Sequence, residues 1–397
     1  MARRHVAALV AGLLPAFAAA CRLPAQQDLQ ALLEARVRER RAVGIAAGVI
    51  EADGSIRVAF AGDAGPEARS LGGLSGFEMG SITKTFTGAL LAEMVRTGEV
   101  RYEDPVSRYL PASVRVPSRN GREITLLDLA THYSGLPGIP DNIEYRDPSN
   151  PYADYTVAQM YAFLSLYQLR TDPGSTYQYS NLGFGLLGHA LSRAANTPFE
   201  QLVRERILRP LGMVRTTIEL RGELAGHMVK GHNKQGSVVP YWDLPTLAGA
   251  GAFRSNLDDM LRYLAANLRP PSTGLEHSLR AAQRTQRMVS DSMFIRLGQE
   301  AIGLGWQIRS VGNARIVWKD GGTAGFQTFI GFDPERGVGA VVLSNTAIEV
   351  DDLGLHLIDP NVPLETPPAI PLRADVPESV LRGYVGEYVQ GPTTRSW

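Results

Sequence analysis

One short segment places a serine and a lysine at a spacing that suits nucleophilic catalysis. Residues 77–88 read FEMGSITKTFTG, which predicts the end of a strand, a turn at Gly80 and then a helix to about Gly98. Ser81 and Lys84 lie three residues apart, so they share one face of that helix. A lysine in a dry pocket can lose its proton and activate a serine hydroxyl. We therefore interpret Ser81 as a candidate nucleophile and Lys84 as its base; the simpler alternative is that Ser81 only caps the helix.

The predicted helix favours burial of that lysine. Residues 85–92 read TFTGALLA, with small and apolar side chains on every side. A helix that is apolar all round lies inside a large domain. We therefore expect Lys84 inside the protein, where an amine needs polar partners or a lowered pKa.

A second polar group follows a turn farther along the chain. Residues 177–181 read YQYSN, after a Pro-Gly turn and before a predicted helix. One interpretation is that Ser180 or Asn181 caps this helix while the tyrosines pack. The functional interpretation is that Tyr179 supplies a phenol for acid/base chemistry and Asn181 an amide that can hold a substrate carbonyl.

A third group lies between two predicted strands near the C-terminus. Residues 318–326 read WKDGGTAGF, which is compatible with an ordinary charged, glycine-rich hairpin loop. In the functional interpretation Lys319 faces a pocket, and Gly321 and Gly322 let a substrate backbone approach. The N–H of Gly322, with that of Ser81, would then form an oxyanion hole.

The three groups together resemble the motifs of a known superfamily. Ser-x-x-Lys, Tyr-x-Asn and Lys-x-Gly, in this order and spacing, resemble those of the penicillin-recognising serine hydrolases, which include DD-peptidases and family VIII esterases. Residues 77–84 are similar to the active-site segment of class C β-lactamases, with Thr83 where serine or alanine is usual. Residues 126–137, LLDLATHYSGLP, resemble the LLTHTSGLP segment of the same superfamily. The resemblance covers roughly residues 30–346.

The resemblance implies a role for each motif residue. Ser81 would be the nucleophile that forms an acyl-enzyme, and Lys84 and Tyr179 would share the proton transfer. Asn181 would orient the amide of the acyl side chain. Lys319 would lie near Tyr179 and the substrate carboxylate. No cofactor takes part in this chemistry.

One residue of the third motif leaves the substrate open. Asp320 stands where class C enzymes have a threonine that helps bind the β-lactam carboxylate, and an aspartate would repel that carboxylate. β-Lactam hydrolysis of the class C type is favoured by residues 77–84. D-alanyl-D-alanine carboxypeptidase or endopeptidase action, esterase action of the family VIII type, and a non-enzymatic penicillin sensor are the alternatives.

Other chemistries find little support in the sequence. There is no G-x-S-x-G nucleophile elbow, and the seven histidines show no metal-ligand spacing, although His227 and His232 are close. Lys and Arg number 40, as do Asp and Glu, so no overall field attracts nucleic acid. We therefore expect no metal and no nucleic acid; the expected partner of a monomer is a small-molecule β-lactam or a peptidoglycan peptide.

The first residues resemble a targeting segment. A basic start, an apolar run and three alanines at 18–20 predict a secretory signal peptide over residues 1–20. Cys21 follows this site directly and would bring the chain to a membrane only if it were lipidated. The expected location is the periplasm.

The order of predicted elements indicates the fold. Strands at both ends and helices between them predict an α/β (α+β) protein with an inserted helical domain. Together with the resemblance, this implies the β-lactamase/transpeptidase-like fold, an antiparallel sheet flanked by helices. The predicted divisions are a sheet domain over 26–75 and 216–350, a helical domain over 76–215 and a C-terminal tail over 351–397.

Overall fold

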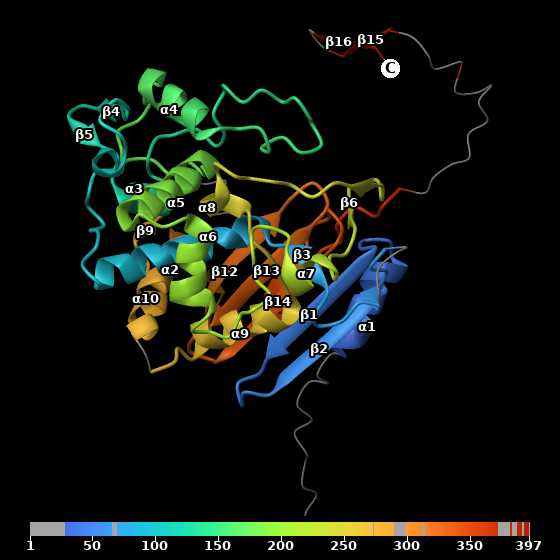
Figure 1. Cartoon of the computed structure of the whole chain (residues 1–397). Coiled ribbons are helices and arrows are strands. Elements are labelled where there is room, and N and C mark those ends of the chain that lie inside the picture. The colour runs from blue at the N-terminus through green and yellow to red at the C-terminus, as the bar shows by residue number, and fades with distance from the viewer. Residues whose placement is uncertain are drawn as a thin grey trace, which may run out of the picture.

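An eight-stranded antiparallel sheet forms the centre of the protein (Figure 1). The computed structural model describes residues 28–65, 70–272, 274–289, 299–311 and 314–371, with Arg382 and the strands β15 (Glu387–Gln390) and β16 (Thr393–Ser396). The signal peptide, Cys21 and most of the tail predicted beyond 371 lie outside these residues. The strand order is β2-β1-β14-β13-β12-β11-β10-β9. The strands of this sheet are β1 (Gly44–Ile50), β2 (Ile56–Gly62), β9 (Arg287–Met288), β10 (Ala301–Ile302), β11 (Gln307–Val311), β12 (Ala314–Gly322), β13 (Gln327–Asp333) and β14 (Val338–Ser344).

The sheet joins the two ends of the described chain. The N-terminal hairpin β1–β2 pairs through β1 with β14, and Ile45 lies opposite Ser344. Every residue of β1 is buried, as expected of a strand covered on both faces. The α/β class and the antiparallel sheet flanked by helices are confirmed. The remaining strands form short pairs: β3 (Gly76–Glu78) with β8 (Arg254–Asn256), β4 (Ser118–Arg119) with β5 (Arg122–Glu123), and β6 (Gly231–His232) with β7 (Val238–Val239).

Helices cover the sheet and extend beyond one end of it, where Figure 1 shows α3, α4 and α5 grouped together. No helix within the described residues combines the length and apolar character that crossing a bilayer requires. The helices are α1 (Leu29–Arg38), α2 (Thr83–Arg96), α3 (Leu126–Ala130), α4 (Val157–Leu166), α5 (Asn181–Ala195), α6 (Phe199–Val203), α7 (Gly222–Ala225), α8 (Ala248–Gly251), α9 (Leu257–Leu268), α10 (Gly274–Gln283) and α12 (Asp351–Ile358).

Two layers of helices enclose the sheet. Helices α1 and α12 pack on one face, and α9 packs on the other. Helix α12 begins where the sequence predicted a C-terminal tail. Its side chains Leu353, Leu355 and Ile358 are buried against the sheet, and this burial makes the segment part of the folded body.

Polar side chains cap several of these helices. Thr156 caps α4 in a reciprocal capping box with Gln159, and Ser180 caps α5, one of the two caps that the sequence offered for that helix. Asn256, and not its neighbour Ser255, caps α9 by accepting the Asp259 N–H, because the Ser255 hydroxyl bonds to Thr216.

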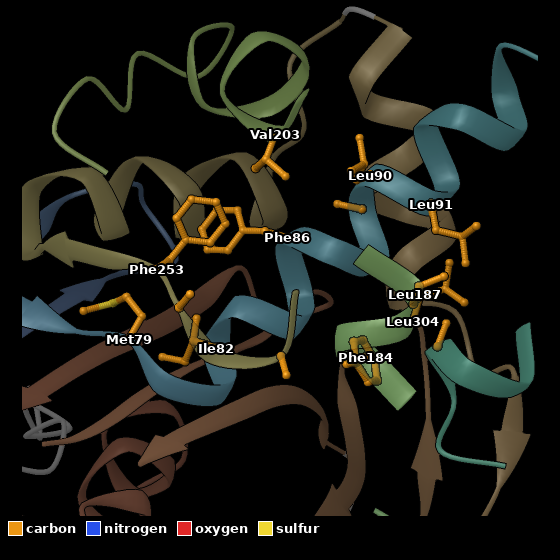
Figure 2. Packing of buried hydrophobic residues seen from close by; sticks show 14 of the residues in the cluster. Met79, Ile82, Phe86, Leu90, Leu91, Phe184, Leu187, Val203, Phe253 and Leu304 are labelled. Atoms are coloured by element: carbon orange, nitrogen blue, oxygen red, sulfur yellow. The ribbon is translucent and has the colours of Figure 1, made fainter. Parts of the chain in front are cut away.

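Helix α2 forms the middle of the core. The Phe86 ring stacks on Tyr263 with centroids 4.1 Å apart and lies 5.4 Å from Phe253. Figure 2 shows Phe86 directed at Phe253 on one side of the helix and Leu91 near Leu187 on the other. The residues of α2 from Thr83 to Ala92 are all buried, as the apolar pattern predicted.

Helix α2 touches the loop between β10 and β11 through its backbone. A Cβ on Gly88 would lie 2.0 Å from the carbonyl oxygen of Leu304, so only glycine fits there. Gly305 has φ +78°, which is the left-handed backbone of a turn and not of a strand. This turn separates β10 from β11, which starts at Gln307.

We expect Gly88→Ala to destabilise the protein even though alanine normally favours a helix. The added methyl would push α2 from the 304–305 backbone, and such overpacking costs about 1–3 kcal/mol of unfolding free energy. Urea unfolding followed by circular dichroism measures the change. Gly72→Ala is the matched control, because no atom lies within 4 Å of its added Cβ. Equal stability of the two variants would show that the helix can shift without cost.

Candidate active site

Ser81 lies in a single 3-10 turn, Gly80–Ile82, directly before α2. Its side chain caps neither this turn nor the helix. Instead, Ser81 Oγ accepts a hydrogen bond from Lys84 Nζ at 2.9 Å and another from the Tyr179 hydroxyl at 2.7 Å. The alternative that Ser81 serves only as a cap therefore does not hold, and two proton-carrying groups converge on one hydroxyl.

Lys84 is fully buried, and each bond of its amine goes to a different segment. Besides Ser81, Nζ donates to Asn181 Oδ1 at 2.7 Å and to the carbonyl oxygen of Ala250 at 2.7 Å. Burial is the main cause that lowers the pKa of Lys84, and the nearby ammonium of Lys319 lowers it further. The amine can therefore act as a proton acceptor at lower pH than an exposed lysine.

Small residues let the Ala250 carbonyl approach the lysine. Helix α8 is a single turn with the sequence AGAG, which the sequence analysis did not connect with the site. A Cβ on Gly249 would lie 2.7 Å from the carbonyl oxygen of Phe184, and one on Gly188 would lie 3.0 Å from Gly249 Cα. Glycines on both helices thus let the backbones of α8 and α5 come close together. This close packing leaves the Ala250 carbonyl oxygen within hydrogen-bond distance of Lys84.

Tyr179 precedes α5 and is held from two sides. Ser180, the next residue, caps α5 by accepting from the Gly183 N–H and donates to the Pro137 carbonyl. Burial by itself would raise the pKa of Tyr179, but the charges of Lys319 and Lys84 outweigh it and place that pKa below its ordinary value.

His132 positions this tyrosine, a role that the sequence analysis missed. Its ring lies 4.3 Å from the Tyr179 ring, and its Nδ1 accepts the Ser180 backbone N–H at 3.0 Å. Burial, followed by the charges of Lys84 and Lys319, lowers the pKa of His132 well below its usual range. The neutral His132 ring therefore packs against Tyr179 and accepts a hydrogen bond from the backbone, and it carries no charge. Its only sequence signal is its place in the THYSGLP segment.

Asn181 makes a contact with the lysine that limits its use toward substrate. Its Oδ1 accepts from Lys84, so contact with a substrate carbonyl must come from Nδ2, because a carbonyl only accepts. The expected role in holding an acyl-group amide is compatible with this geometry.

Lys319 is buried beside the tyrosine and already has an anionic partner. Its Nζ donates to Asp320 Oδ1 at 2.6 Å and lies 5.4 Å from the centre of the Tyr179 ring. Burial would lower the pKa of Lys319, but the Asp320 carboxylate raises it above its ordinary value. Likewise, burial would raise the pKa of Asp320, and Lys319 holds it below its usual range. The two charges therefore neutralise each other at the position expected for a carboxylate-binding cation.

The glycines of the third motif pack against the turn that carries the serine. A Cβ on Gly321 would lie 2.0 Å from the Met79 carbonyl oxygen, and one on Gly80 would lie 2.7 Å from the Gly322 nitrogen. The backbone that approaches Gly321 is thus the protein's own, whereas the sequence analysis expected a substrate there. This packing places Gly322 next to the serine turn, as an oxyanion hole requires.

Two further side chains hold this turn in place. Glu78 is buried and accepts from Thr323 Oγ1 at 2.8 Å and from the Trp242 N–H at 2.7 Å. Burial raises the pKa of Glu78 to about 7, even with Arg254 nearby. Thr83 accepts the Phe253 N–H through its hydroxyl at 3.1 Å, a bond that alanine at this position could not make.

The described residues hold no group of three or more His, Cys, Asp and Glu side chains arranged for a metal ion. The pair of histidines considered in the sequence analysis is engaged elsewhere. His232 Nδ1 lies 3.1 Å from the Asn345 carbonyl oxygen, and His227 Nδ1 lies 2.8 Å from the Glu223 carbonyl oxygen.

Comparison with known proteins shows what the chain is similar to. The family model described as Beta-lactamase matches residues 29–358. The D-alanyl-D-alanine-carboxypeptidase/endopeptidase AmpH of Escherichia coli K12 is 32% identical over 274 residues, which cover 66% of this chain and 69% of AmpH. A beta-lactamase of Pseudomonas fluorescens is 27% identical over 296 residues, which cover 68% of this chain and 79% of the relative.

A solved structure agrees with these relatives. The crystal structure of a beta-lactamase/D-alanine carboxypeptidase from Yersinia pestis complexed with citrate superimposes with a TM-score of 0.69 at 27% identity. The superposition covers 80% of this chain and 93% of that one.

We expect Tyr179→Phe to lower turnover by about 10²–10⁴-fold, because the change removes the hydroxyl that bonds to Ser81 and leaves the ring in place. Hydrolysis of a chromogenic β-lactam and of a p-nitrophenyl ester measures the loss. Tyr177→Phe is the matched control: that tyrosine is also buried, but its hydroxyl accepts from Gln299. Normal turnover in Tyr179→Phe would reduce the phenol to a packing role.

Proposed function

Because this chain belongs to the beta-lactamase family, a family of hydrolases, we propose that it acts through an acyl-enzyme formed on Ser81. One observation carries the proposal: Ser81 Oγ is within 2.9 Å of a buried lysine amine and 2.7 Å of a tyrosine hydroxyl. Such a pair can take the serine proton and return it to a leaving group.

The lowered pKa values of both partners support a proton path through them. When Tyr179 loses its proton, the same 2.7 Å contact can run in reverse, with the Ser81 O–H donating to the phenolate. Lys84 stabilises that phenolate when it is charged, and accepts the proton when it is neutral. His132 holds the Tyr179 ring in position both when the phenol donates to Ser81 and when the phenolate accepts from it.

The proposed reaction has two steps. Ser81 Oγ bonds to the substrate carbonyl carbon and passes its proton to Tyr179, while the N–H groups of Ser81 and Gly322 receive the oxyanion. The bond from carbon to the leaving atom then breaks, and Tyr179 protonates the leaving group. Water next attacks the acyl ester, releases the acid and restores the serine.

We propose a β-lactam amide as substrate, hydrolysed in the manner of class C enzymes. The support is the class C-like segment at 77–84 and the relatives named beta-lactamase, at 27% and 28% identity. Turnover is expected to be slow, because Lys319 is neutralised by Asp320 and offers little net charge to the β-lactam carboxylate.

A D-alanyl-D-alanine peptidase is the second candidate, favoured by the relative AmpH at 32% identity. A β-lactam would acylate Ser81 in both candidates, and they differ in how fast water reaches that ester. Peptidoglycan would be accessible if the chain is exported, and we propose the periplasm as its location on the basis of the leader-like residues 1–20.

We expect a fluorescent penicillin to label the protein and Ser81→Ala to abolish the label without loss of the fold. Intact-mass spectrometry over time then separates the candidates, because the adduct of a lactamase returns to the free mass within seconds. Release of D-alanine from a muropeptide, with a persistent adduct, identifies the peptidase. Labelling that survives Ser81→Ala contradicts the proposal. If the product never exceeds one equivalent per protein, the chain is a sensor. If only p-nitrophenyl esters are cleaved, the chain is an esterase.

We expect Asp320→Thr to lower the KM for penicillins by about tenfold, since Lys319 then becomes free to bond to the substrate carboxylate. Steady-state kinetics with benzylpenicillin measure the change. Asp320→Asn is the control that removes the charge at constant size, and it should act in the same direction. An unchanged KM in both would show that the carboxylate binds elsewhere.

A further inference from the structure

A cavity of about 780 Å³ opens beside the nucleophile and continues away from it. Tyr179, which bonds to Ser81, lines it together with Lys319. The rest of its wall comes from Gln299, β11, β12, Glu349, the start of α12 and residues 362–368. The proposed function uses only Tyr179, Lys319 and Asp320 of this wall, so most of the cavity has no role yet.

The wall holds polar atoms that lack partners among the described residues. Among all the described residues, twelve buried side-chain nitrogen or oxygen atoms have no hydrogen-bond partner, and four of the twelve belong to residues of this one wall. They are Gln307 Oε1, Arg309 Nε, Trp318 Nε1 and Asp351 Oδ1. The Gln307 side chain is secured by its Nε2, which donates to Asp320, and the residue is only 7% exposed. Because an unpaired buried polar group is costly, this concentration indicates a place where a ligand supplies the missing bonds.

The charges of the wall are mostly negative. Five carboxylates line the cavity, and two of them already pair with a cation of their own. Asp320 pairs with Lys319, and Asp352 pairs with Arg36 of α1. For the remaining three, the wall contains one further cationic side chain, Arg309. The five carboxylates are Asp320, Glu349, Asp351, Asp352 and Glu365.

Asp351 is the most informative of these carboxylates. It begins α12, and its Oδ1 is buried without a hydrogen bond from any described residue. Burial, followed by the charge of Asp320, raises the pKa of the Asp351 carboxyl well above its usual range. Lys319 acts in the opposite direction but already pairs with Asp320, so a cation in the cavity would give Asp351 a positive partner of its own.

We propose that this cavity is a substrate subsite for a cationic amine, whose ammonium group lies against Asp351 and Gln307 Oε1. The inference rests on the proposed acyl-enzyme function, and it concerns the leaving-group side, because Tyr179 both lines the cavity and protonates the leaving group. An ammonium N–H supplies the donors that these oxygens lack. A carbonyl or hydroxyl oxygen of the same ligand would satisfy Trp318 Nε1. A ligand that carried a carboxylate in place of the ammonium would be repelled by the excess negative charge of the wall.

The subsite predicts a charge preference that can be measured with three thioesters. Each carries the same phenylacetyl group, and the leaving thiols are dimethylaminoethanethiol, the neutral isostere isopentanethiol, and mercaptopropionate. At neutral pH the first is a tertiary ammonium with one N–H donor, and the Asp351 carboxyl, whose pKa is raised, is ionised to a larger extent than in acid. Thiol release gives kcat/KM, which is divided by the spontaneous hydrolysis rate of the same ester to remove differences in intrinsic reactivity.

We expect the ammonium ester to exceed the neutral ester by roughly tenfold, as one charge-assisted hydrogen bond allows, and the carboxylate ester to be the poorest. The preference should weaken as salt is added. Asp351→Asn should remove most of the preference while the rate on the neutral ester stays near normal. Asp333→Asn is the matched control: it also has a buried, unpartnered carboxylate oxygen, but it lies at the end of β13 outside the cavity.

The outcomes separate this inference from the proposed function. Equal rates on the ammonium and neutral esters, with Ser81 acylated, overturn the subsite and leave the acyl-enzyme intact. Absence of thioester cleavage and of any adduct on Ser81 overturns both.

If Asp351→Asn fails to fold, competition against the neutral ester decides with the unmodified protein. Dimethylaminoethanol should then inhibit more strongly than isopentanol or propionate, and equal inhibition contradicts the subsite.

Discussion

A lysine amine without access to water is the constraint on which this site depends. Lys84 must find its hydrogen-bond acceptors within the protein, because an unpaired buried amine is strongly unfavourable. It finds them on three separate segments: the turn that carries Ser81, the start of α5 at Asn181, and α8 at Ala250. Meeting all three requires α5 and α8 to approach α2 closely, so one side chain ties the serine turn to both helices.

Close approach of the backbone is the second requirement, and glycines make it possible. Gly88 brings α2 onto the loop at Leu304, and Gly321 brings β12 onto the Met79 carbonyl. These contacts attach the serine-bearing segment to β12 on one side and to the loop between β10 and β11 on the other. The hydroxyl of Ser81 is therefore held by rigid elements, as accurate positioning of a reacting atom requires.

The electrostatics of the site differ between its two lysines. Burial leaves Lys84 with a lowered pKa, whereas Lys319 has Asp320 at 2.6 Å and keeps its charge. Lys319 still lowers the pKa of Tyr179, so its charge acts on the proton path although it is neutralised toward an incoming carboxylate. The adjoining cavity is negative because of its other carboxylates, Glu349, Asp351 and Glu365. One residue thus changes what the third motif can recognise without changing the groups around the serine.

The sequence by itself determined the motif residues and the class of the fold. Spacing placed Ser81 and Lys84 on one face, an all-apolar helix implied burial of the lysine, and strands at both ends implied a shared sheet. These are local patterns, set by the period of a helix or strand. The tertiary structure decided what depends on segments far apart in the chain: the Ala250 acceptor, His132 against Tyr179, the contact of Gly321 with Met79, and the unpartnered atoms around Asp351. No local pattern signals these contacts, because each exists only once packing has brought distant backbone together and removed the water between them.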